Sequence, residues 1–351
     1  MRTAPGCDYR EMTDLELHLL NDFQRDFPLA PAPFGVIAGR LGISEAVVLE
    51  ALARLQACGK VSRVGAVFRP HSIGSSTLAA LAVPAEKLDE AAQIVSSYAE
   101  VNHNYEREHR YNLWFVVAAP DETRVQEVLA EIGHRTAHQP LHLPLLEDFH
   151  IDLGFDLSRP HKGSNVRVAC HIPTRQAALK PDLLIGAIQH GLPLVARPFA
   201  EVGARIGLGE NEVIAGLASL AEQGVIKRLG VVVRHHELGY RANAMVVWDI
   251  PDDRVSALGQ SIGSFDCVTL CYRRPRRLPA WRYNLFTMIH GRHRDEVLGL
   301  VAQLKEQCGL EDTAHEILFS SRRFKQCGAH YVASPAAERV GARCNLSAST
   351  G

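Results

Sequence analysis

The chain has 351 residues, a length that predicts two or more domains with separate buried cores. It has 38 Lys and Arg against 39 Asp and Glu, a net charge of −1, so no overall basic excess favours binding to a polyanion. Hydrophobic residues make up 46% and charged residues 22%, which excludes a disordered, collagen-like or coiled-coil chain.

No apolar run approaches the roughly 18 residues that a membrane span requires, and the first residues lack the apolar core of a secretory signal. We therefore expect a cytoplasmic protein without a membrane partner. The eight cysteines lack the two-residue spacing of zinc ribbons and thioredoxin-like sites, so we expect reduced thiols.

The second half of the chain repeats the first. Residues 28–74 align without a gap with residues 193–239, a shift of about 165 residues. The match resumes further on, where the second copy carries an insertion of about five residues. Corresponding residues include Arg63 and Arg228, Arg69 and Arg234, Tyr105 and Tyr272, Arg107 and Arg274, and Asn112 and Asn284.

Each copy begins with three predicted helices and a strand hairpin. In the first copy, helical spacing of apolar residues predicts helices over 14–27 and 34–41, and Ser44 caps a third helix that Gly59 ends. Residues 61–69 are predicted as a β-wing, so the unit resembles a winged helix-turn-helix. The apolar stripe of the third helix comprises Val47, Val48, Leu52 and Leu55.

The second part of each copy alternates strand, helix, strand, strand, helix, strand, which is the ferredoxin-like order. We expect helices beginning at Ala85 and Asp121 in the first copy. The predicted fold class is α+β, a tandem duplication of a winged helix-turn-helix plus a ferredoxin-like domain. The expected strands are 77–83, 101–107, 111–119 and 141–152 in the first copy and 242–250, 267–274, 283–290 and 313–324 in the second.

The chain therefore divides into six segments. We predict helix-turn-helix domains at 12–72 and 176–238, ferredoxin-like domains at 73–157 and 239–331, a linker at 158–175 and a disordered tail at 332–351.

This domain arrangement is that of the Lrp/AsnC transcription regulators, so DNA binding is the first function to weigh. A recognition helix needs cationic and amide side chains to reach phosphates and base edges. The first candidate helix contains Arg54 and Gln56, but it also contains Glu45 and Glu50. The second, residues 209–224, has three Glu and no Lys or Arg. We therefore expect these helices to be packing scaffolds, with no DNA partner.

Cationic, aromatic and imidazole residues gather in the second and third strands of each ferredoxin-like unit and in the turn between them. Guanidinium groups pair carboxylates bidentately, so these clusters predict an anion site, against the alternative of a solvated hairpin tip. The clusters comprise His103, Tyr105, Arg107, His109, Arg110, Tyr111 and Asn112, and then Tyr272, Arg273, Arg274, Arg276, Arg277, Arg282, Tyr283, Asn284 and His290.

The motifs HNYEREHRYNLWFVV and YRRPRRLPAWRYNLFTMIHG, each behind a helix-turn-helix, resemble those of the siroheme decarboxylases of the Ahb and Nir type. The resemblance covers about residues 12–330, as a D-like half followed by an L-like half. It implies loss of the acetate carboxyl groups at C12 and C18 of siroheme, without a cofactor, in haem d1 or alternative haem b biosynthesis. The implied product is 12,18-didecarboxysiroheme.

Siroheme is a flat apolar disc with eight carboxylates, so its site needs arginines, aromatic walls and a proton donor. Candidate proton donors are His109, His290 and His236, while Tyr105 and Tyr272 would orient a carboxylate. His103 would ligate the substrate iron. Candidate substrate-binding residues are Arg107, Arg110, Tyr111, Asn112, Arg273, Arg274, Arg276, Arg277, Trp281 and Tyr283, with Arg63, Arg228, Arg69 and Arg234 as second candidates.

We expect no cofactor beyond the iron of siroheme, and siroheme and its didecarboxylated product as the partners. The two copies should form a pseudo-dimer within the chain, and further association between chains stays open. Two other functions also stay open: an Lrp/AsnC-type DNA-binding regulator and a haem-binding module without catalysis. So does the choice between one shared active site and one in each half.

Overall fold

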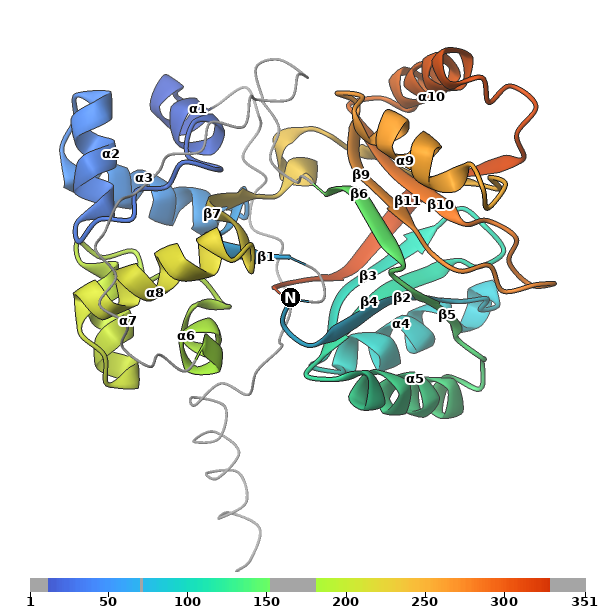
Figure 1. Cartoon of the computed structure of the whole chain (residues 1–351), viewed down its shortest axis with the longest axis horizontal. Helices are drawn as coiled ribbons and strands as arrows, with labels where there is room; N and C mark the ends of the chain where they lie inside the picture. The colour runs from blue at the N-terminus through green and yellow to red at the C-terminus, as the bar shows by residue number, and fades with distance from the viewer. Residues whose placement is uncertain (1–11, 70–71, 152–180, 329–351) are drawn as a thin grey trace, which may run out of the picture.

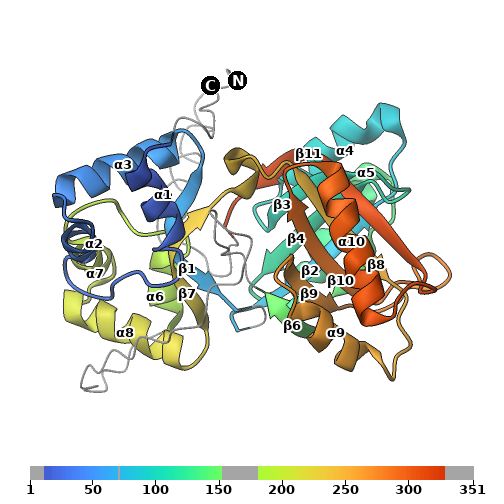
Figure 2. The same ribbon diagram turned by 90° about the horizontal axis from the view of Figure 1, so that it is seen from above.

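A computed structural model of the chain describes residues 12–69, 72–151 and 181–328 (Figure 1). The helices of the two helix-turn-helix units lie together on one side, and the strands of the ferredoxin-like units form two layers on the other (Figures 1 and 2). The predicted linker at 158–175 and tail at 332–351 lie outside the described residues. In the described ranges, no helix has the length and apolar character to cross a membrane.

The predicted helices of the helix-turn-helix units are present, with some different bounds. α1 ends before the predicted residue 27, and its first turn is held by a capping box between Thr13 and Glu16. Val47 is 40% exposed, so it does not belong to the buried stripe that Val48, Leu52 and Leu55 form. The helices are α1 (Asp14–Asn21), α2 (Pro33–Leu41) and α3 (Glu45–Ala57), then α6 (Pro181–Ile188), α7 (Pro198–Ile206) and α8 (Glu210–Glu222).

The predicted wing hairpin within each copy is wrong. Each copy supplies one strand, and β1 (Val61–Phe68) pairs antiparallel with β7 (Ile226–Val233) of the other copy. Gly65 lies opposite Gly230 at the centre of this two-stranded ribbon. A Cβ at Gly230 would lie 2.1 Å from the carbonyl oxygen of Gln24, so only glycine allows this approach. One hydrophobic core joins the helices of both units around the ribbon.

The described strands of the ferredoxin-like units form one hydrogen-bonded series of nine, in the order β5-β2-β4-β3-β11-β8-β10-β9-β6. Each copy contributes four neighbouring strands in the ferredoxin-like order, which agrees with the predicted class. The strands are β2 (Ser75–Leu81), β3 (Val101–Arg107), β4 (Leu113–Ala119), β5 (Leu141–Pro144), β6 (Glu147–Ile151), β8 (Ala242–Trp248), β9 (Val268–Arg273), β10 (Leu285–Gly291) and β11 (His315–Gln326).

The last strand of each copy joins both copies. The strand expected over 141–152 is divided: β5 pairs with β2 of its own copy, and β6 pairs with β9 of the second copy. In the same way, β11 pairs first with β8 and then with β3 of the first copy. This exchange links the two ferredoxin-like units into an intrachain pseudo-dimer.

Helices cover the outer faces of the two layers. α4 (Leu88–Ser97), which follows the short 3₁₀ helix η2 (Ala85–Lys87), and α5 (Glu122–Thr136) cover one face. α9 (Val255–Gly263) and α10 (Arg294–Cys308) cover the opposite face (Figure 1). The inner faces share a core from both copies, with Trp114, Trp281 and Phe286 among its members. Side chains that alternate inward along β3, β4, β9 and β10 therefore lie between the layers.

Candidate functional site

Two equivalent Tyr–Arg pairs point inward from β3 and β9. Tyr105 lies opposite Trp114 in the β3–β4 ladder, and Tyr272 lies opposite Phe286 in the β10–β9 ladder. The guanidinium carbon of Arg107 is 5.9 Å from the ring centroid of Tyr105. The corresponding distance from Arg274 to Tyr272 is 4.6 Å. The correspondence predicted from the repeat is therefore present in space.

Each of these arginines reaches the last strand of the other copy. Nη1 of Arg107 donates to the carbonyl oxygen of Leu318 at 2.9 Å, and Nη1 of Arg274 donates to that of Leu143. Both residues are buried, and their Nε atoms have no hydrogen-bond partner among the described residues. Burial lowers the pKa of Arg107 to about 10 and also lowers the pKa of Arg274. A buried guanidinium without a carboxylate is unfavourable, so these two groups are suited to an anionic ligand.

Two predicted histidines lie on the same inner faces. Burial, and then the charge of Arg107, lowers the pKa of His290 to about 4. Its Nδ1 lies 3.1 Å from Oγ1 of Thr269. His103 stacks on the ring of Tyr105 at 6.1 Å, and burial followed by the charge of Arg63 lowers its pKa to about 4. Both imidazoles are therefore neutral at pH 7 in the protein alone.

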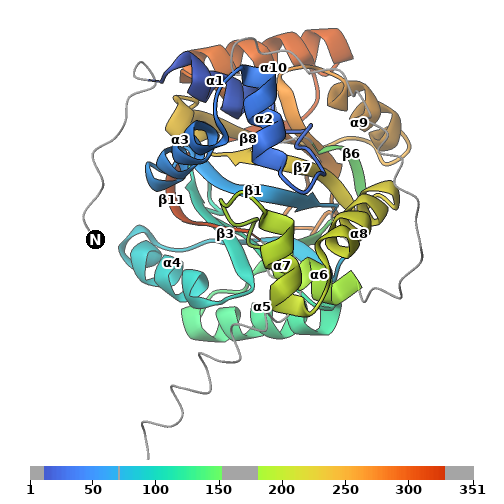
Figure 3. The same ribbon diagram turned by 90° about the vertical axis from the view of Figure 1, so that its left-hand side faces the viewer.

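The ribbon of β1 and β7 lies between the helices and the layers (Figures 1 and 2), and it crosses the centre of the molecule when viewed from the helix side (Figure 3). Further arginines lie on it or next to it. Arg63 is close enough to His103 to lower the pKa of that imidazole, and burial lowers the pKa of Arg63 itself. Burial raises the pKa of Tyr105, and the charges of Arg107, Arg323 and Arg234 partly oppose this rise. The Nε atoms of Arg63 and Arg234 have no partner among the described residues.

Their repeat equivalents are placed differently. Arg228 donates through Nη1 to the carbonyl oxygen of Gln24 at 2.8 Å. Arg69 is exposed. His236 belongs to the 3₁₀ helix η3 (His235–Leu238), and its side chain is outside the described part of the structure. Arg63 also donates to a backbone carbonyl, that of Ala66 at 3.1 Å. What distinguishes Arg63 and Arg234 is that their charges act on His103 and Tyr105.

The arginine-rich run of the second copy already has carboxylate partners, which the sequence reasoning missed. Arg276 bridges Asp249 at 2.8 Å and Asp252 at 2.6 Å, while Arg282 reaches Asp249 at 2.7 Å. Arg273 lies 3.4 Å from Asp252. Burial acts to raise the pKa of Asp249, but hydrogen bonds from Arg276 and Arg282 hold it below its usual value. The clustered acidic residues of the preceding loop, in the stretch DIPDD, were the available signal.

Arg277 and Arg110 contact a backbone carbonyl and an aromatic ring rather than the Tyr–Arg pairs. Arg277 donates through Nε to the carbonyl oxygen of His142 at 2.8 Å, and its backbone pairs with that of Trp281 in both directions. Arg110 is exposed and lies 5.8 Å from the ring centroid of Tyr111. Both contacts border the inner-face core, because Tyr111 belongs to it and because burial, and then the charges of Arg277 and Arg274, lower the pKa of His142.

The rings of His109, Tyr111, Trp281 and Tyr283 pack together around the inserted turn, and the last three belong to the inner-face core. Nδ1 of His109 accepts from the backbone N–H of Tyr111 at 2.9 Å, and Nε2 lies 2.7 Å from Oε2 of Glu316. Tyr283 donates to the other oxygen of Glu316 at 2.8 Å. The ring of Trp281 packs 5.6 Å from that of His109. Both ring nitrogens of His109 are therefore engaged, and Glu316 is a residue that sequence reasoning missed.

The paired asparagines hold loops together. Nδ2 of Asn112 donates to the carbonyl oxygen of Val83 at 2.8 Å, and its Oδ1 accepts from the same residue's N–H at 3.0 Å. Asn284 makes the same two bonds with Ile250, at 2.9 and 3.0 Å. The amide of Asn112, predicted to bind substrate, is thus used within the fold.

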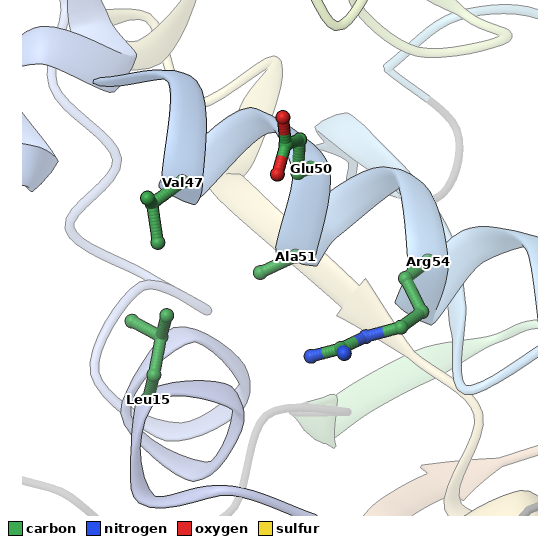
Figure 4. Close-up of a pocket in the computed structure, with 5 residues that line it drawn as sticks. All are labelled: Leu15, Val47, Glu50, Ala51 and Arg54. Atoms are coloured by element: carbon green, nitrogen blue, oxygen red, sulfur yellow. The ribbon is translucent and has the colours of Figure 1, made fainter. Parts of the chain in front are cut away.

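A surface hollow lies elsewhere, between α1 and α3 of the first helix-turn-helix (Figure 4). It is lined by Leu15 of α1 and by Val47, Glu50, Ala51 and Arg54 of α3. It includes none of the predicted site residues, and Arg54 is paired with Glu16 at 3.2 Å. Among the residues that the structure describes, no group of three or more His, Cys, Asp or Glu is placed to hold a metal ion.

Family models match both kinds of unit, each of them twice. The AsnC-like ligand binding domain matches residues 73–150 and 237–325. The siroheme decarboxylase NirDL-like HTH domain matches residues 16–61 and 183–227. Each model therefore matches once in each copy of the repeat.

The chain is also similar to whole proteins. The siroheme decarboxylase NirDL subunit of Paracoccus denitrificans is 45% identical over 321 residues, which are 91% of this chain and 97% of that protein. A siroheme decarboxylase of Hydrogenobacter thermophilus is 33% identical over 318 residues, covering 89% and 93%. The crystal structure of the siroheme decarboxylase NirDL with an iron-uroporphyrin III analogue matches with a TM-score of 0.64 at 29% identity, covering 95% of this chain and 99% of that one.

Proposed function

Because this chain belongs to the siroheme decarboxylase family, we propose that it removes the acetate carboxyl groups at C12 and C18 of siroheme. The product is 12,18-didecarboxysiroheme, and the fusion of two halves favours the haem d1 pathway over the alternative haem b pathway. The observation that carries the proposal is the pair of buried arginines, Arg107 and Arg274, whose Nε atoms lack a partner among the described residues. A ligand with several carboxylates supplies the missing anions.

Four arginines bind the substrate in this proposal. Arg107 and Arg274 hold carboxylates between the layers, and Arg63 and Arg234 hold carboxylates at the ribbon. Tyr105 and Tyr272, next to the two buried arginines, orient the acetates by hydrogen bonding. The remaining predicted substrate-binding residues build or brace the fold around them.

The reaction needs a place for an electron pair and a source of one proton. The bond between the acetate methylene and its carboxyl carbon breaks, and carbon dioxide leaves. The electron pair passes into the conjugated macrocycle, and a proton then joins the methylene carbon to give a methyl group. The step consumes one proton for each carbon dioxide and needs no oxidant, so we propose that no cofactor takes part.

His290 is the proton donor that we favour. It lies on the inner face of β10, within the electrostatic reach of Arg107. Burial and Arg107 keep it neutral in the protein alone, but the carboxylates of siroheme oppose both effects and raise its pKa. His290 thus takes up a proton as the substrate binds. His109, whose nitrogens are both engaged, positions the inserted turn instead.

His103 is the candidate ligand of the substrate iron. Its ring is neutral at pH 7 because burial and Arg63 lower its pKa to about 4, and a neutral imidazole is the form that binds iron. Its stacking on Tyr105 places it beside one of the two Tyr–Arg pairs.

The test is mass spectrometry of siroheme after anaerobic incubation with the purified chain under reducing conditions. We expect loss of two carboxyl groups, and retention of all eight would refute the proposal. His290→Ala separates an enzyme from a haem-binding module, because an enzyme loses turnover while its Soret band on siroheme binding persists. If turnover persists as well, His290 is not the donor.

A DNA-binding regulator is the alternative function that the helix-turn-helix units raise. α8 has no Lys or Arg, and Glu210 in its first turn is paired with Arg197. Arg54 of α3 is likewise paired with Glu16. A gel shift that weakens steeply with salt would support the regulator, and its absence would remove it.

A further inference from the structure

We propose that siroheme binds on the approximate twofold axis of the chain, so that its C12 and C18 acetates each meet one of the two equivalent Tyr–Arg pairs. The inference rests on the proposed function and goes beyond it, because it assigns each acetate its own group of side chains. One bound orientation then serves both reactions.

The protein's approximate symmetry is visible in matched contacts. Gly65 lies opposite Gly230 at the centre of the β1–β7 ribbon. The bond from Arg107 to the carbonyl of Leu318 has its equivalent in the bond from Arg274 to the carbonyl of Leu143. The hydrogen bonds that the side-chain amide of Asn112 makes with Val83 have their equivalent in those of Asn284 with Ile250. Equivalent contacts between the two copies are therefore found in both the ribbon and the layers.

The reactive half of the substrate has a matching symmetry. In a type III tetrapyrrole, the substituents of ring D are inverted relative to those of the other rings. Acetate and propionate at C12 and C13 are therefore followed by propionate and acetate at C17 and C18. A twofold axis in the macrocycle plane through C5 and C15 exchanges these two sets. An Arg–Tyr pair on each side of such an axis meets an acetate with the same neighbouring propionate.

The two sides are alike in Tyr and Arg but differ in their histidines. Ala118 in the first copy corresponds to His290 in the second, because β4 and β10 share one register against β2 and β8. Similarly, His103 corresponds to Leu270. The ladders pair Arg107 with Ser320, and they pair the preceding residue Phe319 with Ala244, which also pairs with Ile289 next to His290. His290 and Arg107 therefore lie toward the same end of the neighbouring strands, so the acetate at Tyr105 and Arg107 has a nearby proton donor. We therefore infer that this acetate is lost first and that the acetate at Arg274 is lost second.

In both steps the methylene–carboxyl bond breaks, carbon dioxide leaves, the electron pair enters the macrocycle and a proton joins the methylene. The two steps differ in which Tyr–Arg pair holds the acetate and in the source of the proton, which is His290 for the first acetate and solvent water for the second. The monodecarboxylated intermediate is therefore one regioisomer, still carrying the acetate held by Tyr272 and Arg274.

The experiment compares Arg107→Gln and Arg274→Gln in the full chain, with siroheme under anaerobic, reducing conditions. Products are separated by chromatography, and the monodecarboxylated isomers are identified by NMR. Each variant should slow one decarboxylation by about 10-fold or more and accumulate a different isomer. The isomer from Arg274→Gln should match the transient intermediate of the unsubstituted protein. Arg124→Gln, on the outer helix α5, is the matched control.

Accumulation of the same isomer by both variants, or equal slowing of both steps, would overturn the inference. If either arginine variant fails to fold, Tyr105→Phe and Tyr272→Phe make the same comparison, because each removes only a hydroxyl group. Failure of the proposed function looks different, since the unsubstituted protein would then release no carbon dioxide.

The type I isomer of siroheme gives an independent test, because it lacks the ring D inversion and carries a propionate at C18. On the proposed axis only one of its acetates in rings C and D meets a Tyr–Arg pair, so one carboxyl group should be lost. Loss of two at similar rates would contradict the symmetry match.

Discussion

His109 of the first copy and Glu316 of the second are joined across the layers, with Nε2 of the imidazole 2.7 Å from Oε2 of the carboxylate. The backbone N–H of Tyr111 occupies Nδ1, so the proton of neutral His109 must lie on Nε2 and point to Glu316. Tyr283 donates to the same carboxylate, and burial together with Glu316 raises its pKa to about 12. These contacts hold the inserted turn and Trp281 against the first copy.

We expect His109→Ala to destabilise the chain while leaving decarboxylation in the folded protein largely intact. A charge-assisted hydrogen bond is worth about 1.5–3 kcal/mol, and the partial exposure of Glu316 reduces this to about 1 kcal/mol. The free energy of unfolding from urea titration measures the loss. His18→Ala is the control, because its 2.7 Å pair with Asp22 lies exposed on α1 and should cost less. Loss of turnover at unchanged stability would instead make His109 the proton donor.

Acid should weaken the fold through His290 and His103. Both pKa values are lowered to about 4, whereas the unfolded chain binds these protons near pH 6.5. The stability from the neutral forms is therefore complete above about pH 6.5 and is lost as the pH falls toward 4. His290→Ala and His103→Leu, which introduce the residues of the other copy, should each reduce this dependence by up to about 1.4 kcal/mol per pH unit.

Urea titrations at several pH values between 7 and 4 check this prediction. The exposed His134 at the end of α5 provides the control substitution, His134→Ala, which should keep the dependence of the original chain. An unchanged pH dependence in both inner-face variants would show that these imidazoles do not resist protonation in the folded state.

The fold was largely predictable because its signals are local. Helical spacing, glycine stops and strand alternation place most elements within a few residues, and internal repetition reveals the duplication. Pairing between copies was not predictable in this way. The paired strands β1 and β7 are far apart in the sequence, and so are β6 and β9. The residues of a single strand do not indicate which distant strand it pairs with. The expected wing hairpin failed for this reason.

For the candidate site as well, the residues that follow from the repeat were predictable, and the contacts between distant loops were not. Arg107, Arg274, Tyr105 and Tyr272 follow from the repeat, and the register of the strands brings them to the inner faces. Charge density alone overstated the run from Arg273 to Arg282, because Asp249 and Asp252 neutralise it from a neighbouring loop. Composition counts charges, but ion pairing depends on which loops meet in space.

Asp249→Asn tests whether those arginines are structural. It removes the carboxylate shared by Arg276 and Arg282, so we expect a loss of about 1 kcal/mol of unfolding free energy. Siroheme affinity, followed by the Soret band, should stay within about twofold, because neither arginine faces the inner site. Asp253→Asn, in the same exposed loop, is the matched control. Markedly tighter binding by Asp249→Asn would mean that the released arginines do hold substrate.

Arg63→Gln and Arg234→Gln test whether the ribbon of β1 and β7 binds substrate. Both Nε atoms lack a partner among the described residues, and the two guanidinium groups act on His103 and Tyr105 at the inner site. Each substitution should weaken siroheme binding by about 10- to 150-fold, the value of one charge-assisted hydrogen bond, and should reduce the dependence of Kd on salt. Arg205→Gln on α7, where the arginine pairs with Glu201 at the surface, is the control for charge loss alone. If all three variants weaken binding equally, the loss comes from the change in net charge alone. If Kd is unchanged in Arg63→Gln and Arg234→Gln, the ribbon does not bind substrate and the binding site lies between the layers.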